Sequence, residues 1–585
     1  MEIPKEITRE VEKWLHPPFD STTRKEVETL LKSDPEELVD AFYRTIPFGT
    51  AGMRGLMGAG PNRMNRYTVG RATQGLANYI TRRAPDHPHK VFISYDSRHH
   101  SKEFAEECAS VLAGNGIASY ITKELRPTPL VSFGCRHLRC TAAVMITASH
   151  NPSLYNGYKV YWSDGAQVVP PHDVGITCEV KEITDQNSVQ KGSLRDPLIR
   201  EVSEELDTAY LRALSRLRTR PHDEPDSPPL SIVYSSLHGT GGTLIHKALR
   251  DRGFDTISSV KRQSVPDGDF PYAPSPNPED PEAMKEGTEQ LILEDKDLLL
   301  ATDPDADRIG VVVNRGGTPV PLTGNQIAAI CAFYLGRTLK ARGDSLKEGV
   351  IITTIVTTGL LREIARFFGI RHIETLTGFK YIGEQIRIRE ETGTPFSFVF
   401  GAEESFGYLY GTYARDKDGV GTAALLAEIA AEAKTRGETL CDLLAEIYRT
   451  FGLFSEKQRS VPFEPGPKGM ASRQNVTETL RRHPPKAIGG VRVTAMEDYG
   501  EGIRRNVTTG EESALTLPAS DVLLFLLEDQ SRVIIRPSGT EPKVKIYGMV
   551  RDDPPKGDID TPLATCRRRL DTLLEATASL APLNP

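Results

Sequence analysis

Four polar loops of this chain carry residue types that can bind and transfer a charged group. In the first, residues 147–152 (TASHNP), Ser149 follows the apolar run 142–146. A short β-type run that ends in small polar residues predicts a loop at the carboxyl end of a strand, where open α/β sheets bind their ligands. Asn151-Pro152 opposes a helix at this point, because the residue before a proline avoids the α region. Such a serine is usually a cap or turn residue, and the other three loops favour a chemical role.

The second loop, residues 303–308 (DPDADR), has aspartates at alternate positions: Asp303, Asp305 and Asp307. Carboxylate oxygens are hard ligands that suit Mg²⁺ or Mn²⁺. Without a cation, neighbouring charges ~4 Å apart would repel by about 4 kcal/mol at an effective dielectric constant near 20. A calcium EF-hand is excluded, because its sixth position here is Arg308 and its twelfth is Asn314. A solvated acidic turn stays open as the alternative.

The third loop, residues 401–408, places Glu403 and Ser405 between glycines, where they can bind vicinal hydroxyls of a sugar. Downstream, Lys417 is a cation that either reaches the same pocket or lies on the surface. The fourth loop offers groups that suit an oxyanion, namely Arg536, Ser538, Gly539 and Thr540. A plain hairpin turn is the alternative for this loop, but it would not need an arginine and two hydroxyls.

The composition limits the class of protein. A chain of 585 residues with 38% hydrophobic and 26% charged residues is typical of a globular protein with several domains. A net charge of −7 argues against a nucleic-acid partner. The seven cysteines form no CxxC pair, which favours reduced thiols, and the apolar runs are too short to span a bilayer. The first residues do not resemble a signal peptide, so we expect a cytoplasmic protein without a membrane partner.

Periodicity and turn signals predict an alternating α/β chain. Strands are expected at 90–95, 231–234, 297–301, 350–356, 396–400, 532–535 and 543–547, and helices at 104–113, 202–217, 360–368, 422–433 and up to residue 580. Proline-rich segments at 221–229 and 462–467 predict linkers. The expected domains are residues 1–218, 230–322, 323–455 and 470–585.

The four loops, in this order, resemble the α-D-phosphohexomutase superfamily of phosphoglucomutases, phosphomannomutases and their relatives. The resemblance covers nearly the whole chain. It implies an α/β fold with three mixed α/β domains of similar plan and a smaller C-terminal α+β domain around a central cleft. It implies no oligomeric state.

The resemblance also implies roles for single residues. Ser149 would cycle through phosphoserine, and its phosphoryl group would share one Mg²⁺ with Asp303, Asp305 and Asp307. Arg54, Arg308 and Lys159 would neutralise the transferring group, and His150 would orient the loop. Lys159 is either a general acid or base whose pKa nearby cations lower, or a permanently charged clamp. The substrate contacts would be Thr377, Gly378, Lys380, Glu403, Ser405, Lys417, Arg308, Arg536, Ser538, Gly539 and Thr540.

The implied reaction interconverts glucose 1-phosphate and glucose 6-phosphate through a bisphosphorylated sugar. Glucose 1,6-bisphosphate would be the primer, and small sugar phosphates would be the partners. The sugar loop is closer to the phosphoglucomutase form, whereas residues 48–65 resemble a long-chain branch that includes phosphopentomutases. Phosphopentomutase and phosphomannomutase activity by the same mechanism stay open. So do a glucose-1,6-bisphosphate synthase, which would use 1,3-bisphosphoglycerate, and a non-catalytic binder of sugar phosphates.

Overall fold

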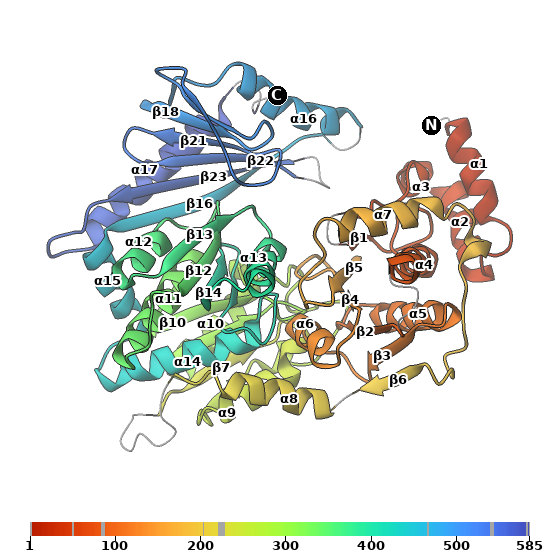
Figure 1. Ribbon diagram of the computed structural model, residues 1–585, viewed down its shortest axis with the longest axis horizontal. Coiled ribbons are helices and arrows are strands. Elements are labelled where there is room, and N and C mark those ends of the chain that lie inside the picture. Colours follow the sequence, from red (N-terminus) through yellow and green to blue (C-terminus); the bar gives the residue numbers. More distant parts are fainter. Residues whose placement is uncertain are drawn as a thin grey trace. The chain divides into compact units, whose positions relative to one another are not determined.

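The computed structural model describes residues 3–49, 52–83, 88–202, 204–219, 229–464, 467–538, 543–580 and 583 (Figure 1). The chain divides into two compact units. The first unit consists of Met1–Gly324, Phe379–Gly401 and Ser405–Gly437, and the second of Asn325–Gly378, Ala402–Glu404 and Glu438–Pro585. Each unit is described by itself.

Three helices form the N-terminal part of the first unit: α1 (Lys5–Trp14), α2 (Ser21–Ser33) and α3 (Pro35–Phe42). Asp20 caps α2 by accepting a hydrogen bond from the Thr23 N–H, and Asp34 caps α3 by accepting one from the Glu37 N–H. Their apolar faces share a core that includes Trp14. This small core precedes the first sheet in the chain.

The first sheet positions the serine loop. Its strand order is β1-β5-β4-β2-β3-β6, with β1 (Gly52–Leu56), β2 (Lys90–Tyr95), β3 (Ala118–Thr122), β4 (Ala142–Ile146), β5 (Tyr155–Trp162) and β6 (Ile199–Val202). The pairs β2–β3, β2–β4 and β3–β6 are parallel, whereas β5 runs antiparallel to β4 and β1. Its helices are α4 (Arg66–Arg83), α5 (Ser101–Gly114), α6 (Thr128–His137) and α7 (His172–Glu182). Ser149 therefore lies just beyond the carboxyl end of the fully buried β4, as the sequence predicts.

The second sheet positions the aspartate loop. Its order is β11-β10-β9-β7-β8, with β7 (Ile232–Ser235), β8 (Ile257–Ser259), β9 (Leu298–Thr302), β10 (Ile309–Arg315) and β11 (Thr318–Leu322). β7 is parallel to β8 and β9, and β10 is antiparallel to β9. Helices α8 (Glu204–Ser215), α9 (Ile245–Arg250) and α10 (Pro281–Leu293) belong to the same unit. The three aspartates occupy the turn between β9 and β10.

A third sheet has the order β13-β12-β14-β15. Its strands are β12 (Gly349–Thr354), β13 (Arg371–Thr375), β14 (Ser397–Glu403) and β15 (Gly407–Leu409). The helices of this region are α11 (Gly324–Ala341), α12 (Leu360–Phe368), α13 (Phe379–Thr392), α14 (Gly419–Thr435) and α15 (Leu440–Phe451). Glu403 is the last residue of β14, so the predicted sugar loop also begins where a strand ends.

The C-terminal sheet, drawn in blue in Figure 1, has the order β16-β23-β22-β21-β18-β19-β20, and β17 pairs with β18. Its strands are β16 (Leu453–Pro462), β17 (Ala487–Ile488), β18 (Val491–Asp498), β19 (Ile503–Asn506), β20 (Glu512–Ala514), β21 (Leu523–Leu527), β22 (Arg532–Pro537) and β23 (Lys543–Asp552). Helix α17 (Asp560–Ala578) packs on β16 and β23, and α16 (Pro467–Arg482) packs on β22. The antiparallel β22–β23 pair and the final helix confirm the sequence prediction.

The predicted elements match these strands and helices, with a few shifted ends. β14 continues to Glu403 and β23 to Asp552, beyond the predicted ends. β23 is longer than predicted because it pairs with β16 along its whole length. Residues 221–228 of the first predicted linker lie outside the described residues. The second is shorter than predicted, because β16 ends at Pro462 and α16 begins at Pro467. The division into four domains stays a prediction. None of the described helices combines the length and apolar character that a bilayer span requires.

Candidate active site

The Ser149 backbone adopts a left-handed conformation, with φ of 53°. A non-glycine residue in this region is strained by roughly 1–3 kcal/mol, and such strain concentrates at functional sites. The Ser149 N–H donates to Thr147 Oγ1 at 2.8 Å, which holds the turn. Its hydroxyl is buried and donates to Asp303 Oδ2 at 2.8 Å, while His150 Nδ1 lies 3.2 Å from the same oxygen. The serine thus meets the aspartate turn directly.

Asp303 organises the aspartate turn. Its Oδ1 accepts the backbone N–H groups of Asp307 at 3.1 Å and Arg308 at 3.0 Å. Ala306, at the tip of the turn, is also left-handed, with φ of 52°. The turn is therefore folded around one carboxylate and held in a strained conformation, which a solvated acidic turn would not require.

The three aspartates fit a divalent cation. All are buried, and one carboxylate oxygen from each lies within 4.8 Å of the others. In the part of the chain that the structure describes, Asp305 Oδ1 and Asp307 Oδ1 are buried without a hydrogen-bond partner. Buried carboxylate oxygens normally have partners, since leaving one unpaired is costly. Hard carboxylate oxygens that converge from three residues, two of them with a partnerless oxygen, match the ligand preference of Mg²⁺.

Cations surround the aspartate turn. Lys159 Nζ donates to Asp305 Oδ2 at 2.6 Å and to Asp307 Oδ2 at 3.0 Å. Lys417 Nζ lies 3.3 Å from Asp307 Oδ2, so this lysine reaches the turn and is not a surface residue. The structure thus brings two of the predicted cations to the predicted metal ligands.

The two predicted arginines lie at the edge of this cluster. Arg54, which is exposed, donates to Asn151 Oδ1 of the serine loop at 3.0 Å and is within electrostatic reach of Asp305. Arg308 Nη1 donates to Glu279 Oε1 at 2.8 Å. Both guanidinium groups therefore border the serine and the aspartates from the same unit.

Burial and mutual charge set the protonation of the site. Burial, followed by the charges of Asp305 and Asp307, holds the pKa of Asp303 well above its usual range. Burial also raises the pKa of Asp307, but Lys159 and Lys417 outweigh it, and the net shift is downward. The pKa values of Asp303 and Asp307 are thus shifted in opposite directions. Perturbed pKa values of this kind are typical of functional sites.

The expectation that cations lower the pKa of Lys159 is wrong for this arrangement. Burial does lower it, but the charges of Asp305 and Asp307 raise it by more, so the net shift is upward. The like charge of Lys417 has a smaller effect. Lys159 therefore has the properties of a fixed cation here, which favours the alternative role of a charged clamp.

Two residues at this site were missed by the sequence analysis. Thr128, the first residue of α6, donates its N–H to the Asp305 carbonyl at 2.8 Å and its Oγ1 hydroxyl to Asp305 Oδ2 at 2.6 Å. Arg98, in the loop after β2, donates to the Ser149 carbonyl at 2.6 Å. An isolated threonine between prolines gives no recognisable signal. For Arg98, the only sequence signal is its position just beyond a predicted strand.

In the second unit, two predicted substrate loops meet. Glu403 Oε1 accepts the Gly378 N–H at 3.0 Å, and Gly378 has φ of 126°, which side-chain-bearing residues rarely adopt. Among the described residues, Thr377 Oγ1 is another buried atom without a hydrogen-bond partner. A carboxylate and a hydroxyl on adjoining loops form a polar surface that suits sugar hydroxyls.

The remaining residues predicted near the sugar belong to the first unit. Ser405 lies in the turn between β14 and β15, next to the left-handed Phe406, with φ of 64°. Lys380 is buried at the start of α13, where burial lowers its pKa and Asp173 of α7 partly restores it. Lys380 therefore has a carboxylate neighbour that the sequence did not indicate.

The predicted phosphate loop follows β22. Arg536 lies on this strand, and the Ser538 N–H donates to the Lys543 carbonyl at 2.9 Å. Gly539 and Thr540 lie outside the described residues. Tyr547 of β23 is buried beside Arg536 and accepts a hydrogen bond from it. Burial raises the pKa of Tyr547, and the charge of Glu404 adds to this. Glu404 and Arg536 thus both act on one tyrosine of the second unit.

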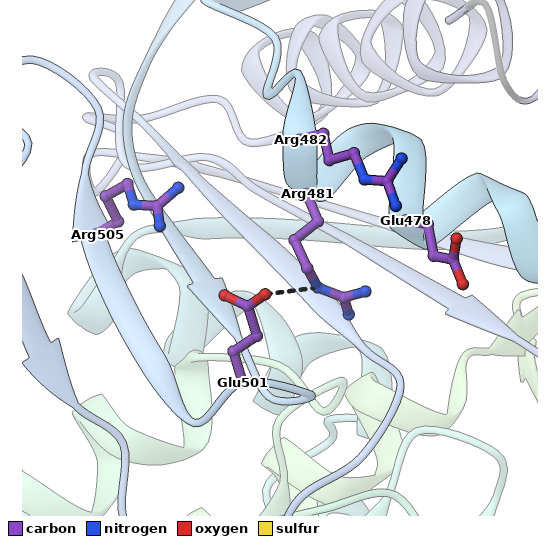
Figure 2. A pocket seen from close by; sticks show the side chains of 5 residues that line it. All are labelled: Glu478, Arg481, Arg482, Glu501 and Arg505. Atoms are coloured by element: carbon purple, nitrogen blue, oxygen red, sulfur yellow. Dashed lines mark ion pairs between the residues drawn. The ribbon is translucent and has the colours of Figure 1, made fainter.

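A separate hollow of about 290 Å³ lies in the second unit, lined by Glu478, Arg481, Arg482, Glu501 and Arg505 (Figure 2). Arg481 Nε lies 3.9 Å from Glu501 Oε1, the pair joined by the dashed line in Figure 2, and 2.5 Å from Asp498 Oδ2. Arg505 pairs with Glu512 at 2.7 Å. Arg481 and Arg505 are thus already paired with carboxylates, so the hollow is not the candidate site.

Comparison with known proteins agrees with this geometry. Family models for phosphoglucomutase/phosphomannomutase α/β/α domains I, II and III match residues 45–187, 208–317 and 323–451. The chain therefore belongs to the phosphoglucomutase/phosphomannomutase family, which confirms the resemblance.

Individual relatives extend this match. The chain is 37% identical over 517 residues to a phosphoglucomutase of Staphylococcus epidermidis, covering 88% of this chain and 92% of that one. It is 34% identical over 551 residues to a phosphoglucomutase of Staphylococcus aureus, covering 92% and 95%.

Solved structures share the fold at lower identity. The Paramecium exocytosis-sensitive phosphoprotein pp63/parafusin, a phosphoglucomutase in its open form, aligns with a TM-score of 0.64 and 17% identity, covering 92% of this chain and 96% of that one. A phosphoglucomutase/phosphomannomutase family protein of Burkholderia thailandensis aligns with a TM-score of 0.64 and 19% identity, covering 91% and 97%. These structures confirm the expected mixed α/β fold with a β-rich C-terminal part.

Proposed function

We propose that the chain is a phosphoglucomutase, which moves a phosphoryl group between the 1- and 6-positions of glucose phosphate through phosphorylated Ser149. The observation that carries this proposal is the 2.8 Å hydrogen bond from Ser149 Oγ to Asp303, within a turn whose other aspartates have partnerless oxygens. Relatives named phosphoglucomutase, 37% and 34% identical, support the same activity.

The chemistry needs strong charge stabilisation, because phosphate monoesters react very slowly unaided. Asp303, Asp305 and Asp307 would hold one Mg²⁺, which when bound neutralises charge on the phosphoryl group. Lys159, Arg54 and Arg308 would add fixed positive charge around the phosphorylated serine, whose phosphate carries about −1.5 to −2. Catalysis by such a site is mainly positioning and electrostatics.

The proposed reaction has two half-reactions. In the first, a sugar hydroxyl oxygen bonds to phosphorus as the bond from phosphorus to Ser149 Oγ breaks. The hydroxyl loses its proton to a base, and Ser149 Oγ regains one. The bisphosphorylated sugar then turns over, and its other phosphoryl group returns to Ser149 by the reverse step. His150 Nδ1, 3.2 Å from Ser149 Oγ, is within reach of the proton on that oxygen.

The other predicted residues would bind the substrate. Glu403 and Ser405 would hold the sugar hydroxyls, with Thr377, Gly378, Lys380 and Lys417 contributing to the choice of orientation. Arg536, Ser538, Gly539 and Thr540 would bind the phosphate that is not reacting. Glucose 1,6-bisphosphate would prime Ser149. We also propose a cytoplasmic location, which is supported by the free thiols of all seven cysteines.

Replacement of the nucleophile tests the proposal. Ser149→Ala should take up no label from ³²P-labelled glucose 1,6-bisphosphate and should lose turnover of glucose 1-phosphate by at least about a thousandfold. Ser110→Ala is the matched control, because the Ser110 hydroxyl of α5 donates to the Gly192 carbonyl at 2.7 Å, outside the candidate site. A fully active Ser149→Ala variant would overturn the proposal.

Parallel assays separate the related activities. With Mg²⁺ and catalytic bisphosphate, glucose 1-phosphate should turn over faster than mannose 1-phosphate and ribose 1-phosphate. Faster turnover of ribose 1-phosphate would assign a phosphopentomutase. A requirement for stoichiometric 1,3-bisphosphoglycerate, with release of the bisphosphate, would assign a glucose-1,6-bisphosphate synthase.

A further inference from the structure

We infer that Arg98 is a positioning residue, whose guanidinium holds the Ser149 turn in its left-handed conformation by binding the carbonyl groups of that turn. The inference deepens the proposed function and rests on it for the role of Ser149. Arg98 follows β2, whereas Ser149 follows β4, the neighbouring parallel strand. The two loops therefore emerge side by side from the same edge of the sheet.

Both terminal nitrogens of the Arg98 guanidinium donate hydrogen bonds to the serine loop. Nη2 donates to the carbonyls of Ser149, at 2.6 Å, and Asn151. Nη1 donates to the carbonyls of Pro152, at 2.7 Å, and Tyr155, at 2.9 Å. One planar cation thus gathers four carbonyl groups from seven consecutive residues.

The remaining contacts fix the guanidinium itself. Its Nε lies 3.2 Å from Asp96 Oδ2, and neither side chain is exposed to solvent. The ring of Phe270 lies under the guanidinium, with 4.9 Å from Cζ to the ring centroid. Asp96 is held in turn by the Ser101 hydroxyl at 2.7 Å. Arg98 is therefore held by a carboxylate and an aromatic ring before it contacts the serine turn.

This arrangement determines where the Ser149 hydroxyl lies. Ser149 has a left-handed φ of 53°, and four carbonyls of its loop accept hydrogen bonds from Arg98. The hydrogen bond to the Ser149 carbonyl is buried and the other three are partly buried, and without the guanidinium all four carbonyls would lose a donor. The strained turn would then relax, and Ser149 Oγ would move away from Asp303. A shift of about 1 Å at a reacting atom can lower the rate about a hundredfold.

Lysine cannot replace this arginine. An ammonium has three donors around one point, whereas the guanidinium presents five in a fixed plane. Arg98→Lys therefore keeps the charge and the approximate volume but cannot bind the four carbonyls together. Arg252→Lys is the matched control, because Arg252 is also buried and also binds a carbonyl, that of Leu214 at 2.7 Å, and a carboxylate, Glu428 at 2.5 Å.

The experiment measures kcat and KM for glucose 1-phosphate, the melting temperature, and hydrogen exchange of residues 147–157 in the full-length variants. Arg98→Lys should lower kcat about a hundredfold, leave KM within about threefold, and speed exchange in this segment. Arg252→Lys should lower the melting temperature without either effect. Guanidinium chloride at low concentration should restore part of the kcat of Arg98→Ala and none in Arg98→Lys.

Other outcomes are equally decisive. A kcat for Arg98→Lys equal to that of Arg252→Lys, or unchanged exchange in residues 147–157, overturns the inference. Should Arg98→Lys not fold, Asp96→Asn tests the same point. It removes the charge that pairs with the guanidinium and should lower kcat at constant KM; an unchanged kcat overturns the inference. An active Ser149→Ala variant instead contradicts the proposed function, while the exchange measurement still reports on the turn.

Discussion

The Ser149 hydroxyl donates a 2.8 Å hydrogen bond to Asp303 Oδ2, although 154 positions separate the two residues in the sequence. This contact depends on the serine proton. When Ser149 carries a phosphoryl group, the donor is gone and a dianion faces three buried carboxylates. The same geometry that holds the free serine therefore repels its phosphorylated form unless a cation lies between them.

Magnesium should stabilise the phosphorylated protein more than the unphosphorylated one. Binding to the folded state alone stabilises by about 2.7 kcal/mol at a concentration a hundred times Kd. Phosphorylation adds a ligand and removes a donor, so it should tighten binding further. Calorimetric melting of both forms, after chelation and after addition of Mg²⁺, measures the difference.

Asp305→Asn is the companion variant for this prediction. It removes one charge from the turn and should weaken the Mg²⁺-dependent rise in melting temperature in both forms. Equal rises for the phosphorylated and unphosphorylated proteins would contradict the proposed geometry.

Thr128→Val should weaken cation binding about tenfold. The hydroxyl of Thr128 donates to Asp305 Oδ2 at 2.6 Å, and it orients that carboxylate toward its neighbours. Valine keeps the shape of threonine and removes the donor. Titration with Mn²⁺, followed by electron paramagnetic resonance, gives the affinity without any assay of turnover. Thr128→Ser keeps the hydroxyl and should bind nearly as the original does; equal weakening in both variants would mean that packing alone matters.

Glu403→Gln should raise KM for glucose 1-phosphate about tenfold or more. In the original protein Glu403 Oε1 accepts the Gly378 N–H at 3.0 Å. The glutamine amide keeps an oxygen that can accept the same N–H, so the loops of Glu403 and Gly378 should stay in contact. It loses the charge, and hydrogen bonds to charged groups contribute about 1.5–3 kcal/mol. Glu391→Gln is the control, because Glu391 is exposed on α13 and its carboxylate accepts a hydrogen bond from Arg387 at 2.9 Å. An unchanged KM would remove Glu403 from the substrate contacts.

Glu456 of β16 should make the stability of the second unit depend on pH. Burial raises its pKa to about 7, while hydrogen bonds with Thr358 and Asn325 lower it in part. An unfolded glutamate releases its proton near 4.5, so the folded state binds more protons between these values. Its contribution to stability is therefore fully present below about pH 4.5 and is lost as pH rises through about 7.

Glu456→Gln should flatten this dependence. Relative to the variant, the original protein should lose on the order of 1 kcal/mol between pH 5.5 and pH 8. Urea unfolding at both pH values measures the difference, with Glu446→Gln, on the exposed face of α15, as control. Parallel pH profiles for the protein and Glu456→Gln would show that this carboxyl does not hold its proton in the fold.

Much of the fold follows from local sequence. The apolar run 90–95 and the amphipathic run 360–368 become β2 and α12 with the predicted bounds, because each is closed by polar or glycine signals. The loops after β4, β9 and β14 were located for the same reason: buried strands end where small polar residues begin. The local sequence pattern is therefore sufficient to predict the bounds of a single strand or helix and the loop that follows it.

Contacts between distant segments could not be predicted in this way. The sequence predicts that neighbouring cations lower the pKa of Lys159. In the structure the largest charge effects come from Asp305 and Asp307, which raise that pKa instead. Arg98 and Thr128 act through backbone carbonyls and a carboxylate far along the chain. No spacing in the sequence marks a residue whose partners are backbone atoms.

The bond between Thr128 and Asp305 has a consequence for how this chain is divided. The segment matched by the first family model supplies the hydroxyl, and the segment matched by the second supplies the acidic turn, yet each completes the other. A fragment that stops before Asp303 would keep Ser149 and lack every carboxylate that faces it. The two segments therefore build one site, and a change at this bond would disturb both the serine segment and the acidic turn.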